Sequence, residues 1–232
     1  MRPMSLHRVS WARVEPERGD YAVAELAELG GRLRGDRAAG LDPVLVLHGG
    51  ALPDWQLARG GWVDPGALAA WSCLVDRVAQ AVGVHVGHYL VMDDLLREAW
   101  WHDGDAAAVA RVLIEAHATA YLHLRRSSGP GGRPPLVGTW VRRGPDPARR
   151  LEERLLAVLA SGRWKAPFGR MGELPNGTAC LDLVATDDAA LLPALVPFAR
   201  PVLLVGIEAE EGRRAGVIVG GLLDRQEPSL NS

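Results

Sequence analysis

Cysteine, lysine and long apolar runs are all scarce in this sequence of 232 residues. Cys73 and Cys180 lie far apart and form no CxxC or Cys/His spacing, so neither a disulfide framework nor a zinc site is indicated. We interpret both as buried thiols in a reducing compartment. Lys165 is the only lysine, and we attribute the preference for arginine to a GC-rich genome rather than to chemistry.

An excess of charge of one sign is also missing. The net charge of -2 supplies no electric field that would attract nucleic acid or an anionic membrane. The N-terminus has no continuous apolar segment typical of a signal peptide, and no run reaches the roughly 18 apolar residues of a membrane helix. We therefore expect a cytoplasmic protein without a nucleic-acid or membrane partner.

Motifs for cofactors are absent as well. The glycines in "GRLRGDRAAG" and "GPGGRPP" do not have the spacing of a phosphate-binding loop, and no His/Cys/Asp/Glu set has metal-ligand spacing. No cofactor or metal is expected. The hydrophobic fraction of 48% and the charged fraction of 23% are those of an ordinary globular protein, and the length fits one domain, residues 1–232.

Short apolar runs alternate with longer segments of helical period, which is typical of βαβ units around a parallel sheet. Asp20 is the expected cap of the first helix, and Asp64 with Pro65 is expected to open the second. The predicted strands are 6–14, 43–49, 85–92, 135–143, 179–186, 201–208 and 216–223. The predicted helices are 21–35, 66–82, 105–125, 146–160 and 187–199.

The connection between the last two predicted strands is unusually short. Only "AEEGRRA" separates them, whereas a parallel crossover needs about a dozen residues. These strands form either a hairpin or a shortened crossover.

Two adjacent aspartates follow the predicted strand 85–92, in "HYLVMDDLLREAW". Aspartate is a favoured helix N-cap, so Asp93 or Asp94 has a simple structural explanation. The alternative is that the pair stands at the working end of a catalytic strand. If both point into one cavity, their mutual repulsion raises one pKa and keeps a proton available for general acid catalysis.

Several segments resemble glycoside hydrolase family 1, the β-glucosidases. "SWARVEP" (10–16) resembles the family's S-W-S-R-I-x-P, "LHGGALPDWQLARGGW" (47–62) its L-Y-H-W-D-L-P-x-W segment, and "GLLDRQEP" (221–228) its S-L-L-D-N-F-E-W ending. "VGHYLVMDDL" (86–95) stands where the family has W-x-T-x-N-E-P. The resemblance implies a (β/α) TIM-type barrel, here truncated, lacking the family's first strand and with a shortened last crossover, whose active site lies at the C-terminal ends of the strands.

The resemblance also implies catalytic positions. Asp94 stands where the family has its acid/base glutamate, and Glu208 near its nucleophile, with Asp93 as a neighbouring carboxylate. Aspartate is shorter than glutamate by one methylene, about 1–1.5 Å, and a misplacement of that size can cost about 100-fold in rate. Glu208 has a second interpretation, as part of the solvated acidic turn "EAEEG".

The residues by which the family binds sugar are largely replaced. Its His, Trp and Asp after the third strand correspond to Gly49, Gly50 and Ala51, and a later Trp to Gly220. Glu227 remains at a sugar-binding position. Ordinary β-glucosidase activity is therefore not expected, and the glycines predict an enlarged, more apolar pocket.

Five further residues are candidates for binding substrate. His48 is either a packed histidine or a proton carrier that lines the pocket. Asp54 and Trp55 are expected in the loop at the rim of the barrel. Trp101 is expected either in the core or in the wall of the barrel opening. Arg13 is expected either to pair with a carboxylate that points into the barrel or to support the barrel structurally.

Two functions remain open. The first is an acid/base enzyme for a small, relatively apolar molecule, catalysing cyclisation, isomerisation, dehydration or hydrolysis of a ketal or glycoside, as a tailoring step in natural-product biosynthesis. The second is a non-catalytic barrel remnant that binds a small molecule or serves as a scaffold. The open edge of a truncated barrel favours a homodimer under either hypothesis.

Overall fold

The computed structural model describes residues 3–49, 52–93, 106–142, 146–164, 168, 172–174, 177–205 and 222–224. Its strands are β1 (Met4–Arg8), β2 (Asp42–His48), β3 (His88–Asp93), β4 (Leu136–Val141), β5 (Arg163–Trp164), β6 (Gly172–Glu173), β7 (Leu183–Thr186), β8 (Val202–Leu204) and β9 (Leu222–Asp224). Its α-helices are α1 (Trp11–Val14), α2 (Val23–Ala38), α3 (Asp54–Leu57), α4 (Ala67–Val82), α6 (Ala106–Arg126), α7 (Asp146–Ser161) and α8 (Leu192–Leu195). Single 3-10 turns lie at Gly61–Val63, Gly83–His85, Pro130–Gly132, Ala189–Leu191 and Val196–Phe198.

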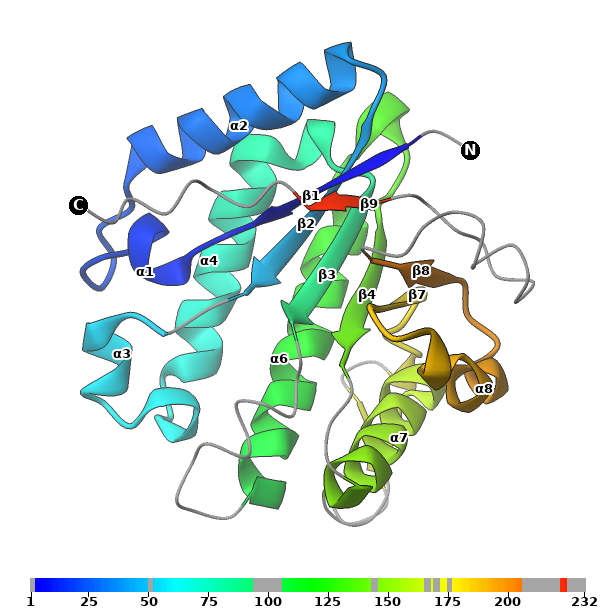
Figure 1. Ribbon diagram of the computed structural model, residues 1–232. Coiled ribbons are helices and arrows are strands. Elements are labelled where there is room, and N and C mark those ends of the chain that lie inside the picture. The colour runs from blue at the N-terminus through cyan, green and yellow to red at the C-terminus, as the bar shows by residue number, and fades with distance from the viewer. Residues whose placement is uncertain are drawn as a thin grey trace, which may run out of the picture.

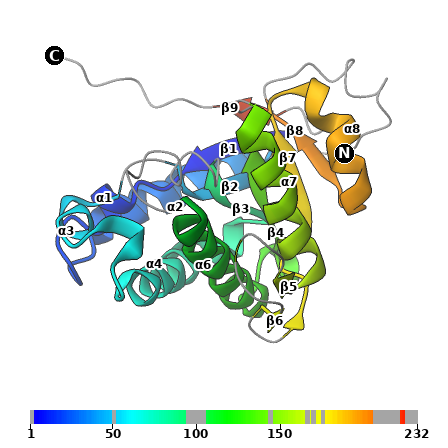
Figure 2. The ribbon, with the colours of Figure 1, turned by 90° about the horizontal axis from the view of Figure 1, so that it is seen from below.

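The main sheet has seven strands in the order β8-β7-β4-β3-β2-β1-β9. Every neighbouring pair in it is parallel, as the alternation of strands and helices predicts. Figure 2 shows that the strands follow an arc, with α2, α4 and α6 on its outer side. The sheet is therefore curled into part of a barrel, and its helices form an outer layer (Figure 1).

The hairpin interpretation of the last two strands is wrong. β8 pairs with β7 and β9 pairs with β1, so the two strands lie at opposite ends of the strand order. Among the described residues no pairing joins β8 to β9. The two strands are therefore not the two arms of a hairpin.

Alternation along the strands divides the sheet into two faces. The interior face of the arc carries a separate apolar cluster, made of Met4, Leu6, Val44, Val46, Leu90, Trp140, Leu183, Ala185, Leu203 and Val205. The outer face packs on the helices: Leu45, Tyr89 and Val137 belong to the large core shared with α2, α4 and α6. The interior face of the described sheet is thus apolar.

The first predicted strand ends earlier than the sequence pattern indicates. β1 stops at Arg8, and Ser10 then caps the short helix α1, accepting a hydrogen bond from the backbone N–H of Arg13 at 3.3 Å. Trp11 is buried, and its Nε1 donates to Glu15 at 2.8 Å. Burial of this tryptophan in the helix layer takes the chain out of the sheet.

Helix positions agree with the predictions, but their starts differ. α2 begins at Val23 with Ala22, not Asp20, at the N-cap, and α4 begins at Ala67 after Gly66. Asp64 nevertheless contributes to the entry into α4, because its carbonyl accepts from the N–H of Ala67 at 2.9 Å. The predicted helix 187–199 is three short turns, of which α8 is the α-helical part.

Only one cysteine is buried as expected. Cys180 is buried, and this burial raises the pKa of its thiol to about 11. Cys73 is exposed, because it lies on the outward face of α4.

One segment, Ala67–His85, is long and apolar enough to cross a membrane by length and composition. It consists of α4 and the 3-10 turn that follows. Trp71, Leu74 and Val78 of this segment are fully packed in the protein core, and core helices pass the same test.

Candidate functional site

Charged side chains gather where the parallel strands end. Arg8 is the last residue of β1, Asp93 the last of β3, Arg142 follows β4 and Asp187 follows β7. In parallel sheets the carboxyl ends of the strands meet at one rim, which is where barrel enzymes carry their active sites. We call these four residues, together with Trp140 of β4, the mouth cluster.

A bulge in β3 brings Asp93 into the mouth cluster. Leu90 pairs with Gly138 and Asp93 with Trp140, so β3 has one residue more than β4 between the two pairs. Without this extra residue, Met92 would follow Leu90 on the interior face and Asp93 would point outward. Bulges often redirect a side chain beside an active site. Here the bulge places Asp93 on the interior face, next to Trp140.

Asp93 is held by two arginines. Nε and Nη2 of Arg142 donate to its Oδ1 at 2.6 Å and its Oδ2 at 3.1 Å, and Nε of Arg8 lies 3.5 Å from Oδ2. Arg142 also donates through Nη1 to Asp187 at 3.2 Å. The Asp93 side chain is 12% exposed, whereas those of Arg8 and Arg142 are 29% and 34% exposed. The carboxylate therefore lies at the base of the cluster and the guanidinium groups reach outward.

The ring of Trp140 lies beneath the two guanidinium groups. The guanidinium carbons of Arg8 and Arg142 lie 5.3 Å and 4.4 Å from its ring centroid, within the range of cation–π attraction. Trp140 is 2% exposed, and its Nε1 has no hydrogen-bond partner within the described part of the chain. A buried donor without a partner favours an acceptor atom when one is supplied.

The glycines that follow β2 do not leave empty space at their first position. A Cβ on Gly49 would lie 3.0 Å from Cδ and 3.2 Å from Cγ of Arg8. The stem of Arg8 thus occupies the place where the resemblance puts a sugar-binding histidine. At Gly49 the stem of Arg8 therefore lies beside the position that an added side chain would take. Gly50, Ala51 and Gly220 lie outside the described residues, so the enlarged, apolar pocket stays a prediction.

Only one predicted catalytic carboxylate belongs to the described residues. Asp93 lies in the mouth cluster, where it fits the orienting role. Asp94 and Glu208 lie outside the described residues, as do Trp101 and Glu227, and their roles stay predictions. Two guanidinium groups lie next to the Asp93 carboxylate. The predicted repulsion between Asp93 and Asp94 involves a residue outside the described ones and stays a prediction.

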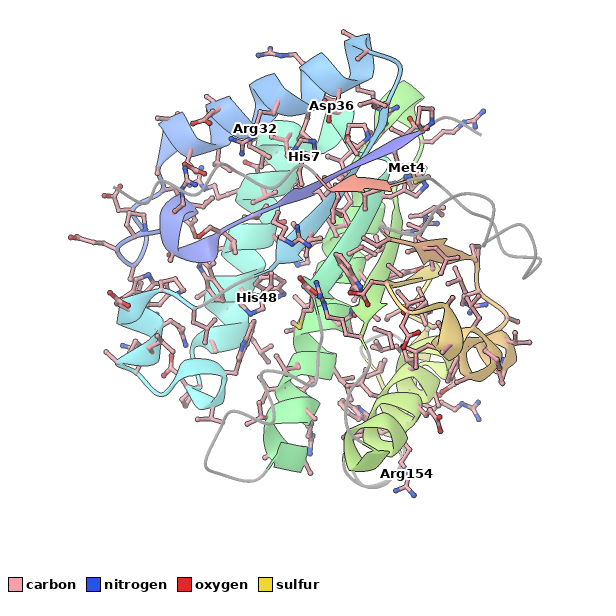
Figure 3. The ribbon with its side chains drawn as sticks, viewed as in Figure 1. Met4, His7, Arg32, Asp36, His48 and Arg154 are labelled. Atoms are coloured by element: carbon pink, nitrogen blue, oxygen red, sulfur yellow. The ribbon has the colours of Figure 1, made fainter. Side chains whose placement is uncertain are left out.

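His48 lies at the end of β2 and is 3% exposed. Its ring meets Trp62 edge-on at 5.5 Å and Trp71 at 6.2 Å. Both tryptophans belong to the core between the sheet and the helices, and Figure 3 shows His48 close to α3 and α4. This surrounding matches the packed histidine of the two interpretations.

Asp54 and Trp55 lie in α3, after β2. Asp54 is exposed, and Trp55 donates to the carbonyl of Glu15 at 3.0 Å and meets Trp11 edge-on at 6.1 Å. Trp55 thus links α3 to the segment after β1. The structure does not bring these residues into the mouth cluster.

Arg13 lies away from the interior of the barrel. It belongs to α1, its side chain is 49% exposed, and its Nη2 donates to Glu25 of α2 at 2.9 Å. Glu25, its partner in this contact, belongs to the helix layer. The arginine that β1 supplies to Asp93 is Arg8.

The sequence interpretation missed Arg8, Trp140, Arg142 and Asp187. A signal for Arg8 existed, because Met4, Leu6 and Arg8 share one face of β1 once the strand ends at Arg8. Gly138 and Trp140 likewise alternate on β4, and Arg142, directly after the strand, continues the spacing.

No protein-family model matches the chain. Solved structures of similar fold include a β-glycosidase from Pyrococcus horikoshii, with a TM-score of 0.73 and 16% identity over 96% of this chain and 70% of that one. A family 1 glycoside hydrolase from Thermotoga maritima has a TM-score of 0.73 and 13% identity over 94% of this chain and 72% of its own. The chain has the fold of a truncated α/β barrel, similar to the barrels of these glycosidases. Identities this low show the fold and not the activity.

Among curated proteins, the bifunctional tRNA 5-methylaminomethyl-2-thiouridine biosynthesis protein MnmC of Burkholderia pseudomallei is 35% identical over 99 residues. The match covers 42% of this chain and 14% of that protein. A match of that extent shows no shared family.

Proposed function

We propose that the protein is an acid/base enzyme that acts on a small molecule at the carboxyl end of its truncated barrel. The observation that carries the proposal is the convergence of Arg8, Asp93, Arg142 and Asp187 from separate strands on the rim where barrel enzymes bind substrate. In this proposal Asp94 acts as the general acid or base and Glu208 as the second carboxylate. Asp93 is a positioning residue.

The positioning role of Asp93 follows from its contacts. Both of its oxygens accept hydrogen bonds from Arg142, the two-point pairing of a carboxylate with a guanidinium group. The pair ties the end of β3 to the end of β4, and Asp94 is the next residue along the chain. A catalytic group must be held within a fraction of an ångström of its productive position, and a neighbouring ion pair provides such a constraint.

The proposed substrate combines an apolar body with one or more oxygen acceptors. The interior face beneath the mouth is apolar, while Trp140 Nε1 is a buried donor without a partner in the described part of the chain. The arginines at the rim suit a carbonyl, ketal or carboxylate oxygen. Cyclisation, isomerisation, dehydration and ketal or glycoside hydrolysis all begin with proton transfer to or from such an oxygen or its neighbouring carbon. We place this chemistry in a tailoring step of natural-product biosynthesis in the cytoplasm.

A second candidate is a non-catalytic barrel remnant. Two observations favour it. The described charges of the mouth cluster pair with one another. The edge strands β8 and β9 are not paired with each other within the described residues, and an exposed edge strand invites pairing with a second chain. A homodimer through this edge is part of both candidate functions.

The two candidates are separated by deleting the gene from its source strain and comparing the small molecules of the two strains. If the protein is an enzyme, a precursor accumulates in the deletion strain, and the purified protein converts it in an extract. Hydrolysis of aryl glycosides by the same preparation would reveal a residual glycosidase. A purified protein that leaves every accumulated compound unchanged, alone or in extract, supports the scaffold and excludes the enzyme.

A further inference from the structure

A hydrogen-bonded chain of serine, histidine and aspartate lies far from the mouth, in the helix layer. Oγ of Ser72 lies 3.3 Å from Nε2 of His123, and Nδ1 of the same ring lies 2.6 Å from Oδ1 of Asp76. Ser72 and Asp76 are separated by four residues on α4, which places them on one face of that helix. His123 lies in the last turn of α6, and α4 and α6 run side by side (Figure 1).

The partners fix the tautomer of His123. A carboxylate only accepts hydrogen bonds, so Nδ1 carries the proton and donates it to Asp76. In the neutral ring Nε2 is then an acceptor, and the Ser72 hydroxyl donates to it. This assignment comes from the hydrogen-bond network. It gives each residue its role in a nucleophilic triad: the serine is positioned to lose its proton to the ring, and the aspartate orients the ring and stabilises its cation.

The three side chains are accessible from solvent. Those of His123 and Asp76 are 28% and 48% exposed, and Ser72 is half-buried. A serine inside a helix commonly donates to a carbonyl of its own helix, as Ser161 does to Ala157 at 2.6 Å. Ser72 instead reaches across to the neighbouring helix, and its hydroxyl is directed at a base.

We propose that Ser72, His123 and Asp76 form a nucleophilic triad between α4 and α6 that accepts an acyl or phosphonyl group from an activated ester. In the acyl reaction, the bond from Ser72 Oγ to the carbonyl carbon forms and the bond from that carbon to the leaving group breaks. The hydroxyl proton passes to His123 Nε2 and from there to the leaving group. No further reactant is needed.

The position of Ser72 on a helix limits the rate. Backbone N–H groups inside an α-helix are bonded to carbonyls of the preceding turn, so the helix offers no free pair of donors for the oxyanion. Removal of one oxyanion donor costs an acyl-transfer enzyme about 10²–10³ in rate. The expected reaction is therefore a slow, stoichiometric modification of Ser72 by activated esters or thioesters, rather than rapid turnover.

A fluorophosphonate tests the proposal directly. Its phosphorus forms a bond with Ser72 Oγ, fluoride leaves, and the proton passes to His123. The full-length protein is incubated with the reagent at neutral pH, and the adduct is located by peptide mass spectrometry. We expect one adduct at Ser72, no adduct in Ser72→Ala, and unchanged labelling in Ser161→Ala, the matched helix serine without a histidine. Cys73→Ser, which removes the adjacent exposed thiol, should label normally.

The role of the base is tested with two variants. His123→Gln and Asp76→Asn should each slow labelling at least about 100-fold, because general-base assistance contributes about 10²–10⁴ and an amide at position 76 favours the wrong tautomer of the ring. If His123→Gln does not fold, Asp76→Asn alone carries the test. Its fold is verified by circular dichroism. Absence of an adduct at Ser72, or equal labelling rates in wild type and Asp76→Asn, overturns the triad and leaves an interhelical hydrogen-bond network.

Discussion

Arg142 donates to both carboxylate oxygens of Asp93, from Nε at 2.6 Å and from Nη2 at 3.1 Å. The contact joins the ends of β3 and β4 across the bulge that turns Asp93 inward. Planar two-point pairing of this kind fixes direction as well as distance. The structure thus defines the geometry of the strand end from which Asp94 continues.

Arg142→Met should destabilise the protein by about 1–3 kcal/mol, because a carboxylate that is mostly buried loses its two-point partner while the methionine still covers Trp140. The stability of Arg142→Lys should lie between those of Arg142→Met and wild type, since lysine keeps the positive charge but cannot donate two parallel hydrogen bonds to the carboxylate. The measurement is urea unfolding. Glu28→Gln, which breaks an exposed ion pair with Arg32, is the control and should cost at most about 0.5 kcal/mol. Equal stabilities of Arg142→Met and Glu28→Gln would contradict the role given to the pair.

Gly49→Ala should be destabilising through Arg8. The new Cβ would lie 3.0 Å from Cδ of Arg8, so the arginine must move away from Asp93. In an Arg8→Ala background this cost should disappear, giving a coupling of about 0.5–1 kcal/mol or more in a double-mutant cycle. Gly31→Ala in α2 serves as the control, because a Cβ added there would meet no atom within 4 Å beyond its own helix backbone, and alanine favours a helix. Strict additivity of the Arg8 and Gly49 substitutions would show that the two residues do not compete for space.

Gly138→Ala should be among the most damaging single substitutions in the sheet. A Cβ there would lie 2.1 Å from the backbone oxygen of Leu183, on the neighbouring strand β7. Backbone cannot rotate away as a side chain can, so β4 and β7 must separate, at a cost of about 1–3 kcal/mol or more. Thermal unfolding measures the effect. A melting temperature close to that of wild type would show that the strands are not packed this closely.

His117 should make stability depend on pH. It is fully buried, its Nε2 donates to the carbonyl of Cys180 at 2.7 Å, and burial lowers its pKa to about 4. The unfolded chain, with a pKa near 6.5, binds the proton more readily, so stability is complete above about pH 6.5 and falls as pH drops toward 4. At 1.36 kcal/mol per pKa unit, the loss approaches about 3 kcal/mol.

The measurement for His117 is urea unfolding at pH 7 and pH 4.5. His88, whose pKa is also lowered by burial, adds a loss of the same sign. His117→Gln should therefore show a smaller difference between the two pH values than wild type, whatever its stability at pH 7. An unchanged difference would mean that His117 does not titrate in this range.

Most of the architecture was predictable because it depends on local periodicity. Parallel strands and the helices between them follow from apolar runs and from the helical spacing in segments such as 67–82 and 146–161. The end of β1 at Arg8 was not predictable from periodicity. Residues 6–14 are apolar enough for one long strand, but burial of Trp11 against other tryptophans ends the strand early.

The mouth cluster depends on contacts between neighbouring strands, which the sequence of a single strand does not indicate. The bulge in β3 exists only relative to β4, and it decides whether Met92 or Asp93 points inward. The fit of Arg8 over Gly49 joins the ends of two strands that are far apart in sequence. The family resemblance directed attention to Arg13, beyond the strand end, whereas strand alternation would have indicated Arg8.

The catalytic assignment is tested most directly by the rate at which purified variants convert the precursor that accumulates in the gene-deletion strain. We predict that Asp94→Asn converts it at least about 100-fold more slowly than wild type while its melting temperature is unchanged or higher, because active-site carboxylates tend to reduce stability. Asp93→Asn should instead lower the melting temperature. Wild-type conversion by Asp94→Asn, at an equal melting temperature, would contradict the proposed acid/base site.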